Sequence, residues 1–228
     1  MPKTPARTPR REDSLTRERI VDAAVELLDN HGEDGLTFRA LSERLATGPG
    51  AIYWHVANKD ELLTAACDAI VAATLAAHTA GKSPAATIRA LALALFDAID
   101  AHPWIGAALT RAPGQSPMVR ILERLGQPLQ AMGVPRARQW STVFALASYV
   151  LGVAGQNAAN AQLARRMPGD GRAAFLDTLA TAWSALDPAA YPFTHGVAAQ
   201  LRVHDDRADF LAGVDLILGG IKAASAKR

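Results

Sequence analysis

The stretch LTFRALSERLATGPGAIYWHVANKDELL, residues 36–63, carries the clearest structural signals of the chain. Thr37 is a favourable N-cap residue, and the pattern after it predicts a helix over 38–45 with one apolar face. Thr47 can cap a third, very short helix, in which Pro49 is tolerated because the first turn has no partner for an amide hydrogen. Two helices joined this tightly cannot lie antiparallel, so the stretch predicts a helix-turn-helix.

Capped helices flank this motif on both sides. Asn58, followed by Glu61 three residues later, makes an Asn-led capping box and predicts a helix that continues to about residue 80. Before the motif, apolar residues at helical spacing predict a helix over 15–31, which Gly32 ends. We therefore expect an N-terminal helix-turn-helix domain over residues 14–62.

Side chains of the third helix indicate a partner outside the domain. Ile52 and Val56 are four residues apart, so they share a face that can pack on the second helix. Tyr53, Trp54 and His55 are displaced from that face, and a helix this short cannot bury all three. Adjacent exposed aromatic side chains imply a partner, and a DNA major groove accommodates a helix. The alternative is a helical hairpin within a larger bundle, with Tyr53 and Trp54 in its core.

Residues around this helix can bind DNA in distinct ways. The Tyr53 hydroxyl and a ring N–H of His55 can reach phosphates, and Trp54 can contact a thymine methyl group or a sugar. Arg39, in the first turn of the second helix, can pair with guanine or phosphate. Lys59 and the first amides of the fourth helix can hold another phosphate. The sequence thus predicts docking on double-stranded DNA, with Arg39 as the leading candidate for a base contact.

The stretch resembles the N-terminal domain of TetR-family repressors, and IYWHVANKDELL is similar to their tetracycline-repressor branch. The resemblance covers about residues 14–75. Ala46 stands where the family usually has a turn glycine, which predicts slight strain. Residues 48–51 offer no long polar side chain for reading bases, which shifts specificity toward Arg39, Trp54 and DNA shape. The resemblance implies DNA contacts from Thr37, Arg39, Thr47, Gly50, Tyr53, Trp54, His55 and Lys59.

Charge supports nucleic-acid binding only locally, because the 228-residue chain has a formal net charge of +2. Residues 1–13 hold four basic side chains and three prolines, and predict a disordered basic arm that either follows DNA or stays solvated. Cys67 is the only cysteine, which excludes an internal disulfide and fits a reducing cytoplasm. No signal-peptide core and no apolar run of membrane-spanning length are present, so we expect a cytoplasmic location without membrane contact.

The rest of the chain reads as helices separated by proline and glycine, and no stretch alternates with the period of a strand. The predicted fold class is therefore all-α. We expect a loop over 187–204, with at most one helical turn, and helices over about 83–101, 103–112, 116–132, 135–166, 171–186 and 206–223. The resemblance implies that residues 63–228 form a helical ligand-binding and dimerisation domain with a small-molecule effector.

Small side chains form a stripe along the long helix over 135–166. They recur at spacings of four, three and four, which puts them on one face: Ser148, Gly152, Gly155 and Ala159. The last helix carries further small residues, including Gly219 and Gly220. We predict that these two helices form a homodimer interface as a four-helix bundle, to which the last helix also contributes Val214, Ile217 and Leu218. Close packing within one chain is the alternative.

Aromatic side chains on the other faces can line a ligand pocket. The candidate wall consists of Phe96, Trp104, Trp140, Phe144, Tyr149 and Trp183. Candidate polar anchors for an anionic or carbonyl-bearing ligand are Arg111, Arg120, Gln156 and Asn157. The alternative is ordinary core packing for the aromatic residues and solvation for the arginines. The histidines show no short ligand spacing, so we predict neither a metal site nor a cofactor.

These patterns predict a dimeric, ligand-responsive repressor that binds a palindromic operator and is released by a small-molecule inducer. An all-helical enzyme is a competing hypothesis. The chain has no serine elbow, phosphate loop, metal-binding histidine pair or dinucleotide fingerprint, so we expect no catalytic residue. A third hypothesis is a protein-interaction module in which Tyr53 and Trp54 anchor a protein partner.

Overall fold

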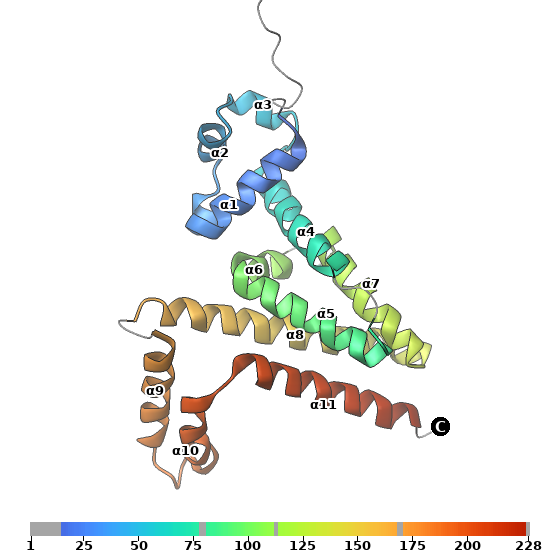
Figure 1. Ribbon diagram of the computed structural model, residues 1–228, viewed down its shortest axis with the longest axis vertical. Coiled ribbons are helices and arrows are strands. Elements are labelled where there is room, and N and C mark those ends of the chain that lie inside the picture. The colour runs from blue at the N-terminus through green and yellow to red at the C-terminus, as the bar shows by residue number, and fades with distance from the viewer. Residues whose placement is uncertain (1–14, 78–80, 112–113, 168–170, 227–228) are drawn as a thin grey trace, which may run out of the picture. The chain divides into compact units, whose positions relative to one another are not determined.

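The computed structural model describes residues 15–77, 81–111, 114–167 and 171–226, of which residues 224–226 are described by their backbone only. Every regular element in these ranges is a helix (Figure 1). The predicted all-α class is confirmed. Internal contacts divide the chain into two units, residues 1–69 and 70–228. The division lies inside α4 (Lys59–Ala77), a little after the boundary expected from the sequence.

The first unit contains α1 (Arg17–Gly35), α2 (Phe38–Arg44), α3 (Pro49–Tyr53) and the beginning of α4. Helix α1 starts where the Thr16 hydroxyl accepts a hydrogen bond from the Arg19 amide at 3.3 Å. Its regular part ends at Gly32, whose φ of 66° favours glycine, before the chain turns once more. The core of the unit consists of fully buried apolar side chains, among them Ile20, Leu28, Leu36, Leu41, Ile52, Val56 and Leu62.

Polar caps define the helix-turn-helix much as the sequence predicts. The Thr37 hydroxyl accepts a hydrogen bond from the Ala40 amide at 3.1 Å, which confirms it as the cap of α2. The Asn58 side chain accepts from the Glu61 amide at 2.8 Å, which confirms the cap of α4. The predicted Thr47 cap is wrong, because the chain is still turning there and Gly48 is the N-cap of α3.

The turn between α2 and α3 carries the predicted strain, since Ala46 has a φ of 49°. This conformation costs an L-residue about 1–2 kcal/mol, whereas glycine adds about 0.4–1 kcal/mol of unfolded-state entropy. We therefore expect Ala46→Gly to raise the free energy of unfolding by about 0.5–1 kcal/mol in urea denaturation. The matched variant Ala40→Gly, inside α2, is expected to lower it by about 1 kcal/mol. A loss of stability in Ala46→Gly would contradict strain at this turn.

Cys67 is buried on α4. Burial, and then the nearby negative charge of Asp68, raise the pKa of its thiol to about 12. The thiol therefore remains protonated at neutral pH and is a poor nucleophile. Its role in the first unit is apolar packing.

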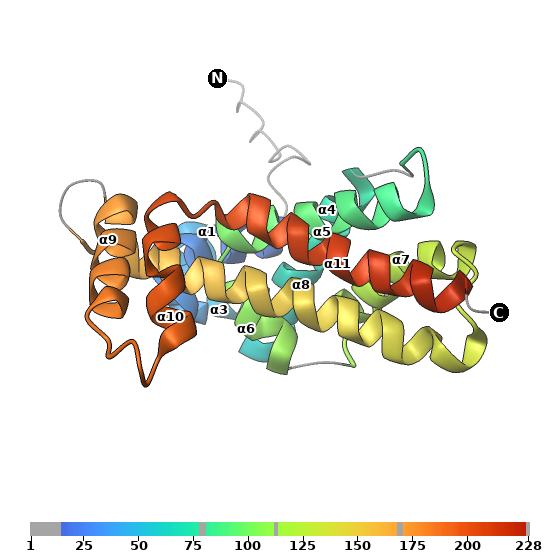
Figure 2. The ribbon, with the colours of Figure 1, turned by 90° about the horizontal axis from the view of Figure 1, so that it is seen from below.

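The second unit follows α4 with α5 (Pro84–Ala101), α6 (Trp104–Arg111), α7 (Ser116–Ala131), α8 (Arg136–Ala164), α9 (Gly171–Ser184), α10 (Pro192–Val197), the 3-10 helix η2 (Ala198–Val203) and α11 (Asp206–Ala226). The loop predicted over 187–204 is wrong in part, because Pro192 occupies the first turn of a helix there. Helices α5, α7 and α11 pack on the long α8, and α11 runs alongside α8 in both views (Figures 1 and 2).

An aromatic cluster joins α11 to α5 and α8. The ring of Phe210 is 1% exposed and stacks on Phe96 and Tyr149, with ring centroids 4.6 and 5.8 Å away. The Tyr149 hydroxyl also donates a hydrogen bond to the Phe210 carbonyl at 3.0 Å. Burial, and then the charge of Asp209, raise the pKa of Tyr149, so this donor keeps its proton.

Gly213 sits against this cluster, and a Cβ there would overlap the Tyr149 hydroxyl and ring. Accommodating it requires Tyr149 to leave its stack and its hydrogen bond. We expect Gly213→Ala to lower the free energy of unfolding by about 1–3 kcal/mol in chemical denaturation. The control is Gly126→Ala on α7, where nothing lies within 4 Å of the added atom, and a gain of about 1 kcal/mol is expected. Equal effects of the two variants would refute the close contact at Gly213.

Candidate functional site

Two aromatic side chains stand out from the surface at the end of α3. Trp54 is 90% exposed and Tyr53 is 53% exposed, while Ile52 and Val56 are buried, as the spacing predicts. Tyr53 does not project freely, because its ring stacks on Phe38 with centroids 4.3 Å apart and planes 10° from parallel. The stack fixes the direction of the Tyr53 hydroxyl, and Trp54 remains the exposed contact surface.

Arg39 projects from the first turn of α2 and is held by its own helix. Its Nε donates to the Glu43 carboxylate at 3.0 Å, and both side chains are exposed. Within the described part of the chain, its two terminal guanidinium nitrogens make no hydrogen bond, which leaves a fork suited to the O6 and N7 acceptors of guanine. Arg44 is different, because it pairs with Glu26 of α1 and thus ties α2 to α1.

Lys59 has a structural contact that the sequence did not indicate. Its ammonium nitrogen donates to the Glu33 carbonyl at 2.6 Å, so the start of α4 is attached to the last turn of α1. A lysine ammonium has three hydrogens, which leaves two for a phosphate. The Lys59 side chain therefore caps α1 and still has donors for the phosphate contact predicted from the sequence.

Glu61 completes this corner of the unit. Its carboxylate accepts from the Ala57 amide at 2.8 Å and pairs with Arg17 at 3.0 Å. The Ala57 amide first, and Arg17 next, lower the pKa of Glu61. Because the pKa is lowered in the folded state, the stability that Glu61 contributes is present above its unfolded pKa and is lost as the pH falls.

The remaining predicted DNA contacts lie on the same unit with different exposure. Gly50 is exposed and has no heavy atom within 4 Å of an added Cβ, so the α3 backbone is open to close approach. Thr37 is exposed, although its hydroxyl caps α2. Thr47 and His55 are half-buried. The charge of His55 is one of the smaller causes that lower the pKa of Glu18, after the Glu18 amide and the Thr16 hydroxyl.

The second unit contains a polar cavity of about 490 Å³ that two predicted ligand residues, Phe96 and Asn157, help to line. Asn157 donates to Asp100 at 3.0 Å, and Arg207 pairs with Asp97 at 3.0 Å. Across the cavity, His204 contacts Asp206 at 2.9 Å, and Arg172 pairs with the same carboxylate. Four carboxylates and two arginines thus surround one apolar ring, a lining suited to a polar ligand that carries an amine.

The stripe of small residues along α8 is uncovered in the protomer. Ser148, Gly152 and Ala159 are exposed, Gly155 is half-buried, and no heavy atom lies within 4 Å of a Cβ added at either glycine. On α11, Leu216 is 79% exposed. The prediction that Val214 and Leu218 contribute to the interface is wrong, because both side chains are buried within the protomer. Ile217 is half-buried.

Comparison with known proteins places these features in a family. Residues 20–66 match the model of bacterial regulatory proteins of the tetR family, and residues 80–225 match that of the tetracyclin repressor-like C-terminal domain. The chain belongs to the TetR family. Its relatives include the transcriptional regulator SCO7222, a TetR from Streptomyces coelicolor, which is 56% identical with a TM-score of 0.83 over 92% of this chain and 99% of that chain.

Curated relatives match the TetR-family chain over less of their length. An HTH-type transcriptional regulator from Saccharopolyspora erythraea is 34% identical over 150 residues, which is 65% of this chain and 63% of that protein. The tetracycline repressor protein class D from Escherichia coli is 46% identical over 72 residues, 32% of this chain and 31% of the repressor. The matched region therefore spans less than two thirds of either relative.

The single aromatic pocket predicted for the TetR-family chain is wrong. Trp140 and Phe144 are 65% and 56% exposed and stack on each other on the outer face of α8. Trp104 is buried, and Tyr149 belongs to the cluster around Phe210. Arg111 and Arg120 are exposed at α6 and α7 and line none of the described cavities. Helix α8 is apolar on two faces, so residue spacing alone could not show that Trp140 and Phe144 lie on its outer face.

Among the described residues, no helix combines the length and the apolar character needed to cross a membrane. In the same part of the chain, no three histidine, cysteine or carboxylate side chains come together as a metal site would require.

Proposed function

We propose that this TetR-family protein is a dimeric repressor that binds a palindromic DNA operator and is released by a small-molecule inducer. The observation that carries the proposal is the exposed Trp54, beside a Tyr53 that is fixed by stacking on Phe38, at the end of the third helix of a helix-turn-helix. An exposed tryptophan of this kind indicates a partner, and the family match supports DNA as that partner.

In this proposal, some residues position the protein on the DNA phosphates and others read the bases. Tyr53, His55 and Lys59 contact phosphates, and the open backbone at Gly50 lets α3 approach the base edges. Arg39 pairs its terminal nitrogens with a guanine, and Trp54 contacts a thymine methyl group. Thr37 at the N-cap of α2 and Thr47 in the turn before α3 complete the set of contacts. Because only Arg39 and Trp54 reach base edges, DNA shape supplies part of the specificity.

The dimer uses the uncovered faces of α8 and α11. The open space at Gly152 and Gly155 lets a helix of a second copy approach closely, and Trp140, Phe144 and Leu216 provide apolar area around the stripe. An apolar face of this kind is more favourable when covered by a partner. A two-fold dimer then matches a palindromic operator.

The effector binds the cavity beside Phe96 and Asn157. For the effector to release the DNA, it must bind one conformation of the dimer more tightly than the other. The resulting shift in the conformational equilibrium cannot exceed that difference in affinity. The cavity touches the beginning of α11 through Asp206 and Arg207, so a ligand there acts on a helix of the proposed interface.

Selection of bound fragments from a random DNA library tests the proposal directly. We expect the purified full chain to enrich one palindromic sequence and to bind it at physiological salt with at least about a thousandfold preference over random duplex. Binding that ignores sequence and disappears at moderate salt would overturn operator recognition. Enrichment of no DNA by an intact dimer would favour the protein-interaction alternative.

A further inference from the structure

Arg39 and Glu43 form an ion pair on the surface of α2, one helical turn apart. Nε of Arg39 donates to a carboxylate oxygen of Glu43 at 3.0 Å, and the two side chains are 90% and 67% exposed. The pair joins no other helix, and an exposed pair at this spacing contributes little to the stability of a fold. Stability alone therefore gives no reason for the pair.

The positions of the two residues also oppose the electrostatics of the helix. Helix α2 contains Phe38–Arg44, so Arg39 lies in its first turn and Glu43 in its last. A helix favours negative charge near its N-terminus and positive charge near its C-terminus. At a spacing of four residues, the acid is also better placed before the base than after it. A pair that served the stability of α2 would have the opposite order.

The contact uses a different edge of the guanidinium from two other ion pairs of the first unit. Arg17 and Arg44 reach Glu61 and Glu26 through a terminal nitrogen, and each of these pairs joins two helices. Arg39 is held through Nε instead, which leaves the parallel N–H groups of both terminal nitrogens for another acceptor. This end of the guanidinium matches N7 and O6 of guanine.

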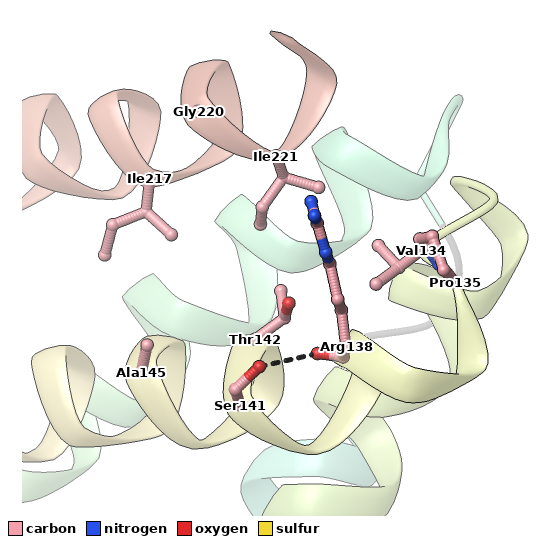
Figure 3. A pocket seen from close by; sticks show the side chains of 9 residues that line it. All are labelled: Val134, Pro135, Arg138, Ser141, Thr142, Ala145, Ile217, Gly220 and Ile221. Carbon is pink, nitrogen blue, oxygen red and sulfur yellow. Dashed lines mark hydrogen bonds between the residues drawn. The ribbon is translucent and has the colours of Figure 1, made fainter. Parts of the chain in front are cut away.

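Arg138, on α8, shows how an arginine of the protomer lies when no carboxylate holds it. Its side chain extends across the groove between α8 and α11, with the guanidinium beside Ile221 (Figure 3). Among the residues that the structure describes, this guanidinium forms no hydrogen bond and no ion pair. Long cationic side chains lay their stems along apolar surface in this way. Glu43 opposes such a rearrangement of Arg39, because it fixes the guanidinium at Nε.

We propose that Glu43 is a positioning residue for base recognition, which aims the terminal nitrogens of Arg39 at a guanine of the operator. This inference rests on the proposed function and adds to it a residue that touches no base itself. The bond to Nε restricts the rotamers of Arg39 before DNA binds, so less side-chain entropy is lost when the guanine is contacted. The carboxylate also weakens the attraction of the guanidinium for phosphates, which carry no sequence information.

The base selectivity of Glu43 variants tests this role. The operator is first selected with the parent protein, and the guanine read by Arg39 is the one whose preference disappears in Arg39→Ala. Selectivity is the ratio of the affinities for this operator and for the same duplex with adenine in place of that guanine, both measured by fluorescence anisotropy. Glu43→Ala is expected to lower the selectivity about fivefold or more and to raise the affinity for random duplex. Its midpoint in urea denaturation is expected to equal that of the parent protein.

Two further variants separate positioning from charge. Glu43→Gln keeps an oxygen that can accept from Nε of Arg39 but loses the negative charge, so it is expected to retain most of the selectivity. Glu26→Ala is the matched control, because it removes the carboxylate that pairs with Arg44, the other arginine of α2. We expect it to leave the selectivity unchanged.

Parental selectivity in Glu43→Ala would overturn the positioning role while leaving operator recognition intact. An equal loss of selectivity in Glu26→Ala would also overturn it, because the loss would then follow from removing any acid of the unit. The same holds for an operator in which no guanine preference depends on Arg39. If the parent protein enriches no sequence, operator recognition itself fails, and the positioning role fails with it.

Discussion

Trp54→Ala is expected to weaken operator binding by about 30-fold or more while the free energy of unfolding stays within about 0.5 kcal/mol of the parent protein. The side chain is 90% exposed, so its removal opens no cavity in the core. Its loss removes the largest apolar contact that the end of α3 offers to DNA. Fluorescence anisotropy with the selected operator measures the affinity, and urea denaturation measures stability.

Phe193→Ala on α10 is the matched control for this variant, because it also removes an aromatic side chain that is 79% exposed. We expect it to bind the operator like the parent protein. Unchanged operator affinity in Trp54→Ala would contradict docking through the end of α3. Tyr53 and Lys59 are poorer choices for this experiment, since Tyr53 stacks on Phe38 and Lys59 attaches α4 to α1, so their replacement also destabilises the unit.

Gly152→Leu is expected to convert the proposed dimer to a monomer. In the protomer, a side chain at Gly152 meets no heavy atom within 4 Å, so the fold tolerates leucine and gains about 1 kcal/mol from helix propensity. In a closely packed interface, the same side chain appears twice through the two-fold axis and holds the helices apart. Sedimentation or light scattering at micromolar protein measures the change in mass.

Ala107→Leu, on the exposed surface of α6, controls for the added apolar surface and is expected to remain dimeric. A Gly152→Leu protein that stays dimeric would remove the α8 stripe from the interface. A parent protein that is monomeric would remove the proposed dimer itself. Loss of operator binding together with loss of the dimer would connect the interface with recognition of a palindrome.

The sequence predicted most where short-range chemistry decides the structure. The caps at Thr37 and Asn58, the strained Ala46 and the exposed pair Tyr53 and Trp54 depend on neighbours within a few residues, and the structure confirms them. The helix at Pro192 was missed because proline was taken as a break, although it is favourable in a first turn.

Contacts between residues that are distant in sequence could not be predicted from local sequence patterns. Nothing near Lys59 in sequence indicates that its ammonium caps the carbonyl of Glu33. Helix α8 is apolar around much of its circumference, so its periodicity could not decide that Trp140 and Phe144 lie outside while Tyr149 lies inside. The burial of Val214 likewise depends on the packing of α11 against α5 and α8, which its sequence pattern does not reveal.

The ion pairs of the first unit bear on how it meets DNA. Arg17, Arg39 and Arg44 are each matched by a carboxylate of the same unit, so their fields largely cancel at a distance. Such a surface gives little electrostatic steering during diffusion. An arginine that leaves its carboxylate for a phosphate frees a DNA counterion but exposes an acid that attracts another cation. We therefore expect operator affinity to fall less steeply with ionic strength than the number of phosphate contacts alone would give.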